Sequence, residues 1–76
     1  MSKADISKIH RIFGENVRNI RVKKGLTIKE VSLKTGITEK YLFKIENGNA
    51  KGMKISHICK LAIALNMLPH QLCEGI

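Results

Sequence analysis

Two threonines that can each begin a helix stand close together in the chain, on either side of a glycine. Thr27 is followed three residues later by Glu30, so the threonine oxygen can accept from the amide of residue 30 while the glutamate reaches back. Thr38 offers a second cap only two residues after Gly36. The segment between the caps has room for only about two helical turns. These signals predict two short helices joined by a tight turn.

Apolar residues recur at spacings of three and four on both sides of this pair, which predicts two further amphipathic helices. The upstream set is Ile6, Ile9, Phe13, Val17 and Ile20, and the downstream set is Ile55, Ile58, Leu61, Ala62 and Leu65. Gly25 and Asn66 are suited to end these helices. Gly14 costs about 1 kcal/mol of helix propensity, so the turn before it is expected to be separate or frayed. Pro69 fits the first position of a short final helix that contains Gln71, Leu72 and Cys73.

No segment alternates strictly enough between apolar and polar residues to predict a strand. The expected fold is therefore all-α, a compact bundle of five helices. With 76 residues the chain can build only one small core, so a single domain over residues 1–76 is predicted. Aromatic residues make up only 4% of the chain, which leaves a thin aliphatic core. A dimer often supplies the burial that so small a core lacks.

The charge balance points to a polyanionic partner. Fourteen Lys and Arg against six Asp and Glu give a formal net charge of +8, and nine of the basic residues fall within residues 1–38. The sequence shows no signal peptide and no apolar run of about 18 residues, so a cytoplasmic protein without a membrane partner is expected. The two cysteines lack the spacing of a disulfide scaffold, which suits a reducing compartment.

Three stretches of the chain resemble the Cro and phage-repressor (XRE-like) type of helix-turn-helix transcriptional regulators. They run from Phe13 to Arg21, from Lys24 to Thr27, and from Gly36 to Gly48, and the most specific piece is Ile45-Glu46-Asn47-Gly48. The resemblance covers about residues 9–74 and implies a lambda-repressor-like DNA-binding domain with its helix-turn-helix at about 27–47. The short length is similar both to restriction-modification controller proteins and to small phage repressors.

The resemblance implies that one side of the second short helix enters the major groove of duplex DNA. The matching positions are Thr38, Glu39, Lys40, Phe43 and Lys44. Their chemistry suits base recognition, because lysine can donate to guanine, glutamate can accept from cytosine, and an apolar group can contact the thymine methyl. We therefore expect these residues to read the sequence. The alternative is that they form only a solvated helix face.

A second group matches positions that hold the DNA backbone. Its members are Ile28, Lys29, Tyr41, Asn47 and Lys51, with the backbone amides at residues 28 and 29 opening a helix. The family usually has a glutamine at position 28 whose side chain binds a phosphate. Ile28 cannot make that contact, so we expect the affinity for DNA to depend more on lysines. Any of these lysines can instead be a solubilising surface residue.

Two further features follow from the resemblance and from the late apolar residues. Arg21 and Glu46 match a pair that ties the first helix to the end of the recognition helix, and breaking a partly buried pair can cost about 3–5 kcal/mol. Ile63, Met67 and Leu68 extend the apolar surface and suggest a homodimer interface, or alternatively close a small core. A two-fold dimer places its recognition helices about 34 Å apart on a palindromic operator.

The sequence pattern favours neither a zinc site nor an enzyme. His57, Cys59, His70 and Cys73 lack the four-ligand spacing of a structural zinc site, and both cysteines are expected to be small buried hydrophobes. No phosphate loop, carboxylate pair or nucleophile motif is present, so we expect no enzyme activity, no metal and no cofactor.

The sequence thus predicts a sequence-specific, dimeric repressor or autoregulator that binds double-stranded DNA. Activation would add a contact to RNA polymerase. The first alternative is a protein-interaction module, such as an antitoxin bound to its toxin or an adaptor, which uses the patch of Ile63, Met67 and Leu68. The second is binding of nucleic acid through charge alone, which would show steep salt dependence without a preferred site.

Overall fold

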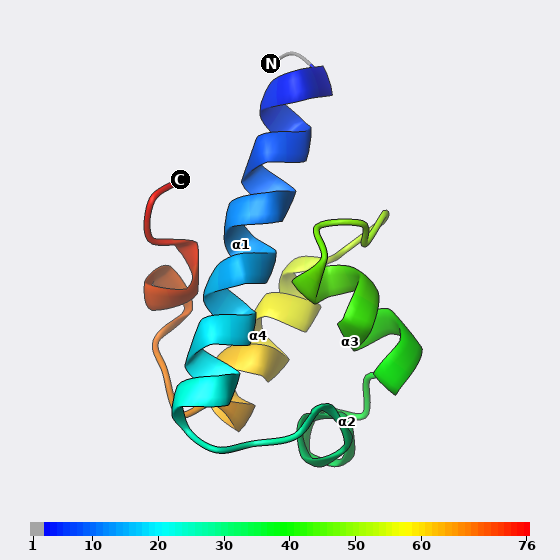
Figure 1. The fold of residues 1–76 in the computed structure, drawn as a ribbon, viewed down its shortest axis with the longest axis vertical. Coiled ribbons are helices and arrows are strands. Elements are labelled where there is room, and N and C mark those ends of the chain that lie inside the picture. Colours follow the sequence, from blue (N-terminus) through cyan, green and yellow to red (C-terminus); the bar gives the residue numbers. More distant parts are fainter. Residues whose placement is uncertain (1–2) are drawn as a thin grey trace.

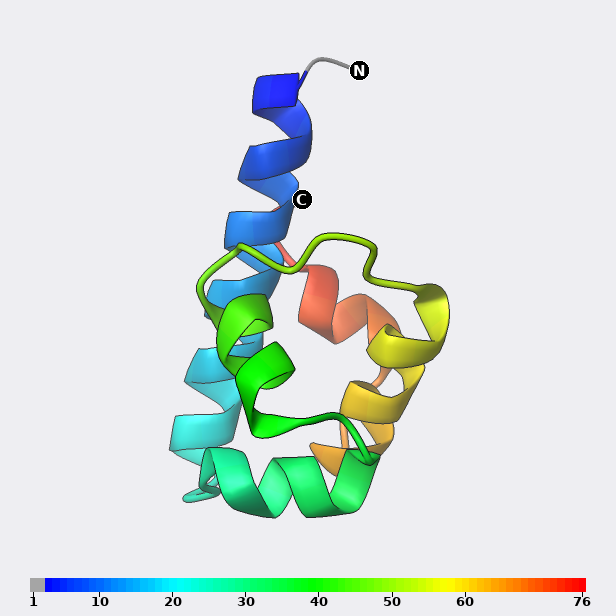
Figure 2. The ribbon, with the colours of Figure 1, turned by 90° about the vertical axis from the view of Figure 1, so that its right-hand side faces the viewer.

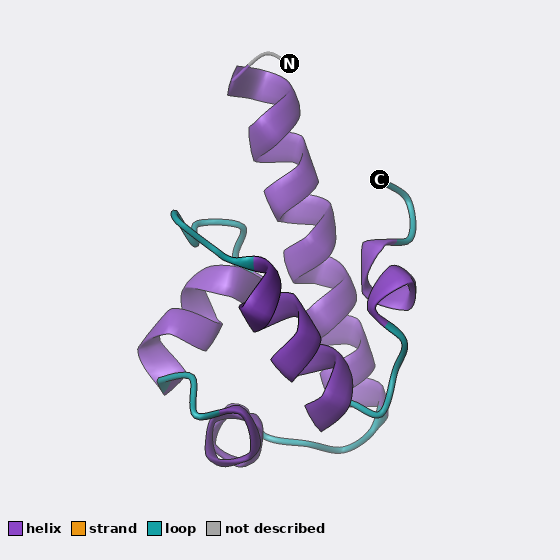
Figure 3. Cartoon of the chain, turned by 180° about the vertical axis from the view of Figure 1, so that it is seen from behind, coloured by secondary structure: helices purple, strands orange, loops and turns teal. Residues whose placement is uncertain are grey.

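Helices supply all the regular structure in residues 3–76, the part of the chain that the computed structural model describes (Figure 3). They are α1 (Lys3–Lys23), α2 (Ile28–Thr35), α3 (Glu39–Glu46), α4 (Ile55–Ala64) and a 3-10 helix, η1 (Pro69–Cys73). The all-α prediction is confirmed for these residues. The predicted count of five helices is wrong, because the described chain has four α-helices and its last element is a 3-10 helix.

The long helix α1 forms the spine of the molecule, with α3 on one side and η1 on the other (Figure 1). Turned by 90°, the molecule shows α2 crossing its lower end, between α3 and α4 (Figure 2). The first turns of α1 project beyond the other helices in both views. One side of α3 therefore faces outward, while its other side packs on α1 and α2.

The core lies where the inner faces of all five elements meet. Its largest fully buried side chains are Leu42, Ile45, Leu61, Leu65, Leu72, Val17 and Val31. Phe13 adds the one aromatic ring that is almost entirely buried. The aliphatic composition of the core agrees with the prediction from the low aromatic content. Because each helix contributes only one or two of these residues, the core depends on every element being in place.

Local capping signals fix the two short helices as predicted. The Thr27 hydroxyl oxygen accepts from the Glu30 amide at 3.1 Å, and the Glu30 carboxylate accepts from the Thr27 amide at 3.1 Å. At the end of α2, Gly36 adopts a φ of 76°, in the left-handed region that favours glycine. Thr38 then caps α3 by accepting from the Tyr41 amide at 3.1 Å. The helix-turn-helix pair is thus determined by residues within its own segment.

The first helix is continuous through Gly14, contrary to the expected break or frayed turn. Gly14 lies where α1 crosses the end of α3, and a Cβ added there would meet the carbonyl oxygen of Ile45 and lie 2.8 Å from that of Glu46. The glycine therefore serves the close approach of two backbones. The packing of the two helices outweighs the propensity cost of about 1 kcal/mol.

The chain after α4 forms a tighter element than the predicted final helix. Asn66 adopts a φ of 54° and ends α4 as expected. The following segment is only five residues long, and its Gln71 amide bonds the Leu68 carbonyl at 2.9 Å in a 3-10 pattern. So short an element gains little from α-helical bonding, whereas a single 3-10 turn still buries Leu72.

Three residues are more exposed than the apolar periodicity predicts. Ile6 and Ile55 begin their amphipathic stripes but are exposed; Ile6 lies in the first turns of α1, which project past the core (Figure 1), and Ile55 is the first residue of α4. Cys59 is exposed, so its prediction as a small buried hydrophobe is wrong, while Cys73 is half-buried. Periodicity identifies a helix face but does not determine how far along the helix the core extends.

Candidate nucleic-acid interface

The turn between α2 and α3 is held by two hydroxyl side chains. The Ser32 hydroxyl donates to the Ile37 carbonyl oxygen at 2.6 Å. The buried Thr35 hydroxyl donates to the Val31 carbonyl oxygen at 2.8 Å and accepts from the Ile37 amide at 3.1 Å. With Ile37 itself buried, these bonds fix the direction in which α3 leaves the turn. The side chains of the turn thus set the orientation of α3 relative to α2.

The outward side of α3 carries the residues predicted to read DNA bases. Leu42 and Ile45 are each only 1% exposed, so they occupy the inner face. Phe43, on the other side, is 61% exposed. The remaining predicted base contacts are also exposed: Thr38, Glu39, Lys40 and Lys44. Thr38 caps α3, and Glu39, Lys40, Phe43 and Lys44 lie away from its buried face, so the helix exposes donors, an acceptor and an apolar ring.

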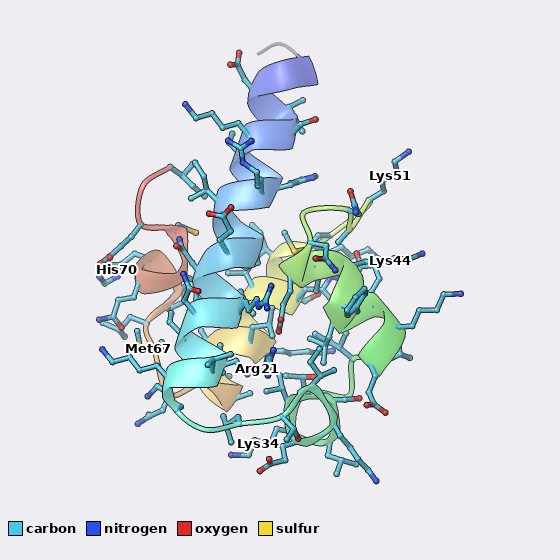
Figure 4. All side chains as sticks on the ribbon, viewed as in Figure 1. Arg21, Lys34, Lys44, Lys51, Met67 and His70 are labelled. Atoms are coloured by element: carbon cyan, nitrogen blue, oxygen red, sulfur yellow. The ribbon has the colours of Figure 1, made fainter. Side chains whose placement is uncertain are left out.

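The predicted backbone contacts surround this surface. Lys29 and Lys51 are exposed, and Lys44 and Lys51 extend from the same side of the molecule (Figure 4). Ile28 is half-buried at the first position of α2 and offers DNA only its backbone amide. Asn47 donates to the Phe43 carbonyl oxygen at 2.9 Å and so caps the other end of α3. Its amide keeps a second N–H for another acceptor.

Tyr41 has a structural role beside any contact with DNA. Its hydroxyl donates to the Lys51 carbonyl oxygen at 3.2 Å, and its ring lies 5.2 Å from the ring of His57. His57 in turn accepts from the Lys54 amide at 2.9 Å through Nδ1. These contacts join α3 to the loop before α4 and hold Lys51 in place. To donate to a phosphate, the Tyr41 hydroxyl would have to give up its hydrogen bond to the Lys51 carbonyl oxygen.

An ion pair connects α1 to the end of the recognition helix. The Arg21 guanidinium donates to both Glu46 carboxylate oxygens, at 2.7 Å from Nε and 3.0 Å from Nη2. A third bond runs from Nη1 to the Leu26 carbonyl oxygen at 2.9 Å. Hydrogen bonding to Glu46 raises the pKa of Arg21 above its usual value, against the opposing effect of partial burial. The pair has the fork geometry of a positioning contact, and its charges largely neutralise each other.

Two basic side chains of α1 that the sequence interpretation did not assign lie beside this surface. Arg18 lines a groove of about 290 Å³ together with Ile28, Phe43 and Asn47. Arg11 lines a second groove with Asn47 and Asn49. Their spacing of seven residues places them on one face of α1, but it does not reveal that this face lies beside the end of α3.

The residues predicted as a dimer interface differ in exposure. Ile63 is 80% exposed and Leu68 is 58% exposed, so neither closes the core. Met67 is half-buried and packs against the core. In Figure 4 its label lies on the opposite side of the molecule from Lys44 and Lys51. The structure thus leaves the apolar side chains of Ile63 and Leu68 uncovered by any element in residues 3–76.

Across residues 3–76, no three His, Cys, Asp or Glu side chains come together as a metal site would require. Within that same range, every helix falls short of the length and apolar character required to span a bilayer.

Comparison with known proteins gives the same fold and motif. Residues 14–75 match the family model of the helix-turn-helix domain. The crystal structure of the restriction-modification controller protein C.AhdI from Aeromonas hydrophila is similar, with 30% sequence identity and a TM-score of 0.78. The match covers 91% of this chain and 97% of that one. A search of curated proteins gives no significant match. On the family match and the shared fold, the chain belongs to the helix-turn-helix family of Cro and phage-repressor type, a family of DNA-binding transcriptional regulators.

Proposed function

We propose that this protein is a sequence-specific transcriptional regulator that binds duplex DNA through α3. The observation that carries the proposal is the exposed side of α3, where Thr38, Glu39, Lys40, Phe43 and Lys44 offer hydrogen-bond donors, an acceptor and an apolar ring. Such a mixture suits the distinct pattern of groups that each base pair presents in the major groove. Charge alone would not require a glutamate there, because its carboxylate repels phosphates.

The residues around α3 position it on the DNA backbone. The backbone amides of Ile28 and Lys29 open α2, where unpaired N–H groups and the helix dipole favour a phosphate. Asn47 and Lys51 lie at the other end of α3, and Tyr41 holds the loop that carries Lys51. Phosphate contacts at both ends fix the register of a helix in the groove, while the bases specify the sequence.

The protein acts as a homodimer that joins two copies through Ile63, Leu68 and the partly buried Met67. The two exposed apolar side chains favour this assembly, because a second copy would remove them from water. A two-fold dimer predicts an operator with inverted half-sites about 10 bp apart. Occlusion of RNA polymerase at such a site would make the protein a repressor or autoregulator, a role in keeping with its similarity to a restriction-modification controller protein.

Selection of bound duplexes from a random DNA pool, at one near-physiological salt concentration, tests the proposal. We expect enrichment of an inverted repeat, and changed base preference for the variants Glu39→Gln, Lys40→Gln and Lys44→Gln. The matched control is Lys34→Gln, which removes an exposed charge from α2 and should leave the preference unchanged. Binding without enrichment of any sequence would contradict a sequence-specific regulator and favour binding through charge alone.

A further inference from the structure

Arg11 and Arg18 flank the contact between α1 and α3. Gly14, which lies between them in sequence, contacts the carbonyl groups of Ile45 and Glu46 at the end of α3. On a helix of 3.6 residues per turn, Arg11 and Arg18 fall within about 20° of each other, beside the direction of Gly14. Both are exposed. The packing that fixes Gly14 against α3 therefore also fixes where these two guanidinium groups emerge.

Two neighbouring grooves place these arginines beside the proposed DNA contacts. One groove is lined by Arg18, Ile28, Phe43 and Asn47, and the other by Arg11, Asn47 and Asn49, together with other residues of α1 and α3. Asn47 lines both, so the two grooves meet at the C-terminal end of the recognition helix. The surface of α1 thus continues the surface of α3 without a gap.

The position of Arg11 is fixed by backbone contact. Gly48, directly after Asn47, lies so close to α1 that a Cβ added to it would be 3.0 Å from the Arg11 Cα. Arg11 therefore cannot move relative to Asn47 without displacing the end of α3. The backbone of Arg11 is therefore held beside the end of α3, and its exposed side chain extends from that fixed point.

Both arginines are available to an outside anion. Arg21, on the same helix, is neutralised by Glu46, but no ion pair joins Arg11 or Arg18 to an acidic residue within the described part of the chain. Glu15, the acidic residue between them, shares a separate groove with Arg18 and Lys23 but forms no ion pair with Arg18. In the groove of Arg18, the side chain of Ile28 carries no donor. Arg18 is thus the group there that can bind an anion with a free guanidinium.

We propose that Arg11 and Arg18 hold the phosphate backbone of one DNA strand along the junction of α1 with the end of α3, on either side of Asn47. This inference rests on the proposed binding of duplex DNA by α3. Seven helical residues separate the Cα atoms of the two arginines by about 10 Å along α1, so the two guanidinium groups can contact different phosphates of one strand. Guanidinium groups suit the task because they donate two parallel bonds to a phosphate.

The test measures affinity for the duplex enriched by selection, over a range of salt concentrations. We expect Arg11→Gln and Arg18→Gln each to weaken binding roughly tenfold, as the loss of a charged hydrogen bond predicts. The slope of log K against the logarithm of the salt concentration is negative. It should become less steep by about 0.9 for each single variant and by about 1.8 for the double variant. Arg11→Lys and Arg18→Lys keep the charge and should retain most of the slope.

Lys34→Gln is the matched control, since it removes one exposed positive charge at the other end of the molecule (Figure 4). It should change the affinity by no more than about twofold and the slope by no more than about 0.3, because Lys34 is not among the proposed phosphate or base contacts. Circular dichroism of each variant establishes that the fold is retained. If the wild-type protein binds the enriched duplex and the double arginine variant matches it in affinity and slope, the phosphate contact is refuted while DNA binding stands. If the wild-type protein binds no duplex, the proposed function itself fails.

Discussion

Gly14 is the residue on which the position of the recognition helix most directly depends. Any side chain there would enter the space occupied by the carbonyl groups of Ile45 and Glu46. These atoms belong to the backbone at the end of α3, so they cannot turn aside as a side chain would. A larger residue must therefore push α3 away from α1.

We expect Gly14→Ala to lower the free energy of unfolding by roughly 2 kcal/mol. Overpacking by one methyl group costs about 1–3 kcal/mol, and contact with backbone carbonyl groups places Gly14→Ala at the upper end, so the gain of about 1 kcal/mol in helix propensity leaves a net loss of about 2 kcal/mol. Urea unfolding followed by circular dichroism measures the change. Asn19→Ala, at an exposed position of the same helix, is the control and should be neutral or slightly stabilising. If the Gly14→Ala protein were as stable as the parent, α3 could move away from α1 without a loss in the free energy of unfolding, which would contradict this prediction.

Glu46→Gln tests how much the ion pair with Arg21 contributes to the free energy of unfolding. The carboxylate accepts two bonds from a guanidinium that is 14% exposed, while the Glu46 side chain is only 6% exposed. The neutral amide keeps the shape but leaves a partly buried cation without its counter-charge, so we expect a loss of about 2–3 kcal/mol. Glu39→Gln, at an exposed position, should change stability by less than about 0.5 kcal/mol. Equal midpoints of urea unfolding for the two variants would refute a stabilising role for the pair.

At the scale of the elements, local signals were predictable and tertiary ones were not. Thr27, Gly36 and Thr38 act on amides and torsion angles within their own turns, so α2 and α3 could be bounded from sequence. The continuity of α1 through Gly14 depends on the approach of α3, which no local pattern reveals. The 3-10 form of the last element likewise depends on seating Leu72 in the core.

The turn between α2 and α3 gives a prediction that links stability to DNA binding. Thr35→Val keeps the shape of the buried side chain but removes the acceptor for the Ile37 amide, at an expected cost of about 1–3 kcal/mol. Because this bond also directs α3, affinity for the enriched duplex should fall more than stability alone explains. Fluorescence anisotropy, measured well below the unfolding midpoint, follows the affinity.

A stability-matched variant separates these two effects. Asn16→Ala removes bonds to the Leu72 and Glu74 carbonyl oxygens, at 2.9 and 2.8 Å, on the side of α1 that faces η1. It should reduce stability by about 1–2 kcal/mol and leave affinity almost unchanged. Equal affinities for Thr35→Val and Asn16→Ala would mean that the turn does not direct α3.

At the scale of the whole molecule, the candidate site was only partly accessible from sequence. The five predicted base contacts share one helix, so periodicity alone could place them on its exposed side. Arg11 and Arg18 could not be assigned in this way, because their place beside Asn47 arises from the crossing of α1 and α3. Their contact with phosphate, like the base contacts, remains a prediction.

The uncovered side chains of Ile63 and Leu68 predict the state of assembly. We expect the double variant Ile63→Asp, Leu68→Asp to be monomeric in sedimentation equilibrium and to bind the operator more weakly than the parent. The monomer of this variant should keep its fold and its cooperative unfolding, because both replaced side chains are exposed. Ile55→Asp, at another exposed isoleucine of α4, is the control and should leave the dimer intact. A dimer that persists in the double variant would place the interface elsewhere.

The bonds from Asn16 to the segment around Leu72 also bear on the order of events during synthesis. These partners are 56 and 58 residues apart, and Leu72 is fully buried beneath α1. The ribosome therefore makes all four α-helices before it makes the residue that completes their core. A nascent chain that stalls before Leu72 should have helices that form and melt locally, and should be open to proteases and unable to bind DNA. DNA binding would thus begin only once that segment has emerged and docked on α1.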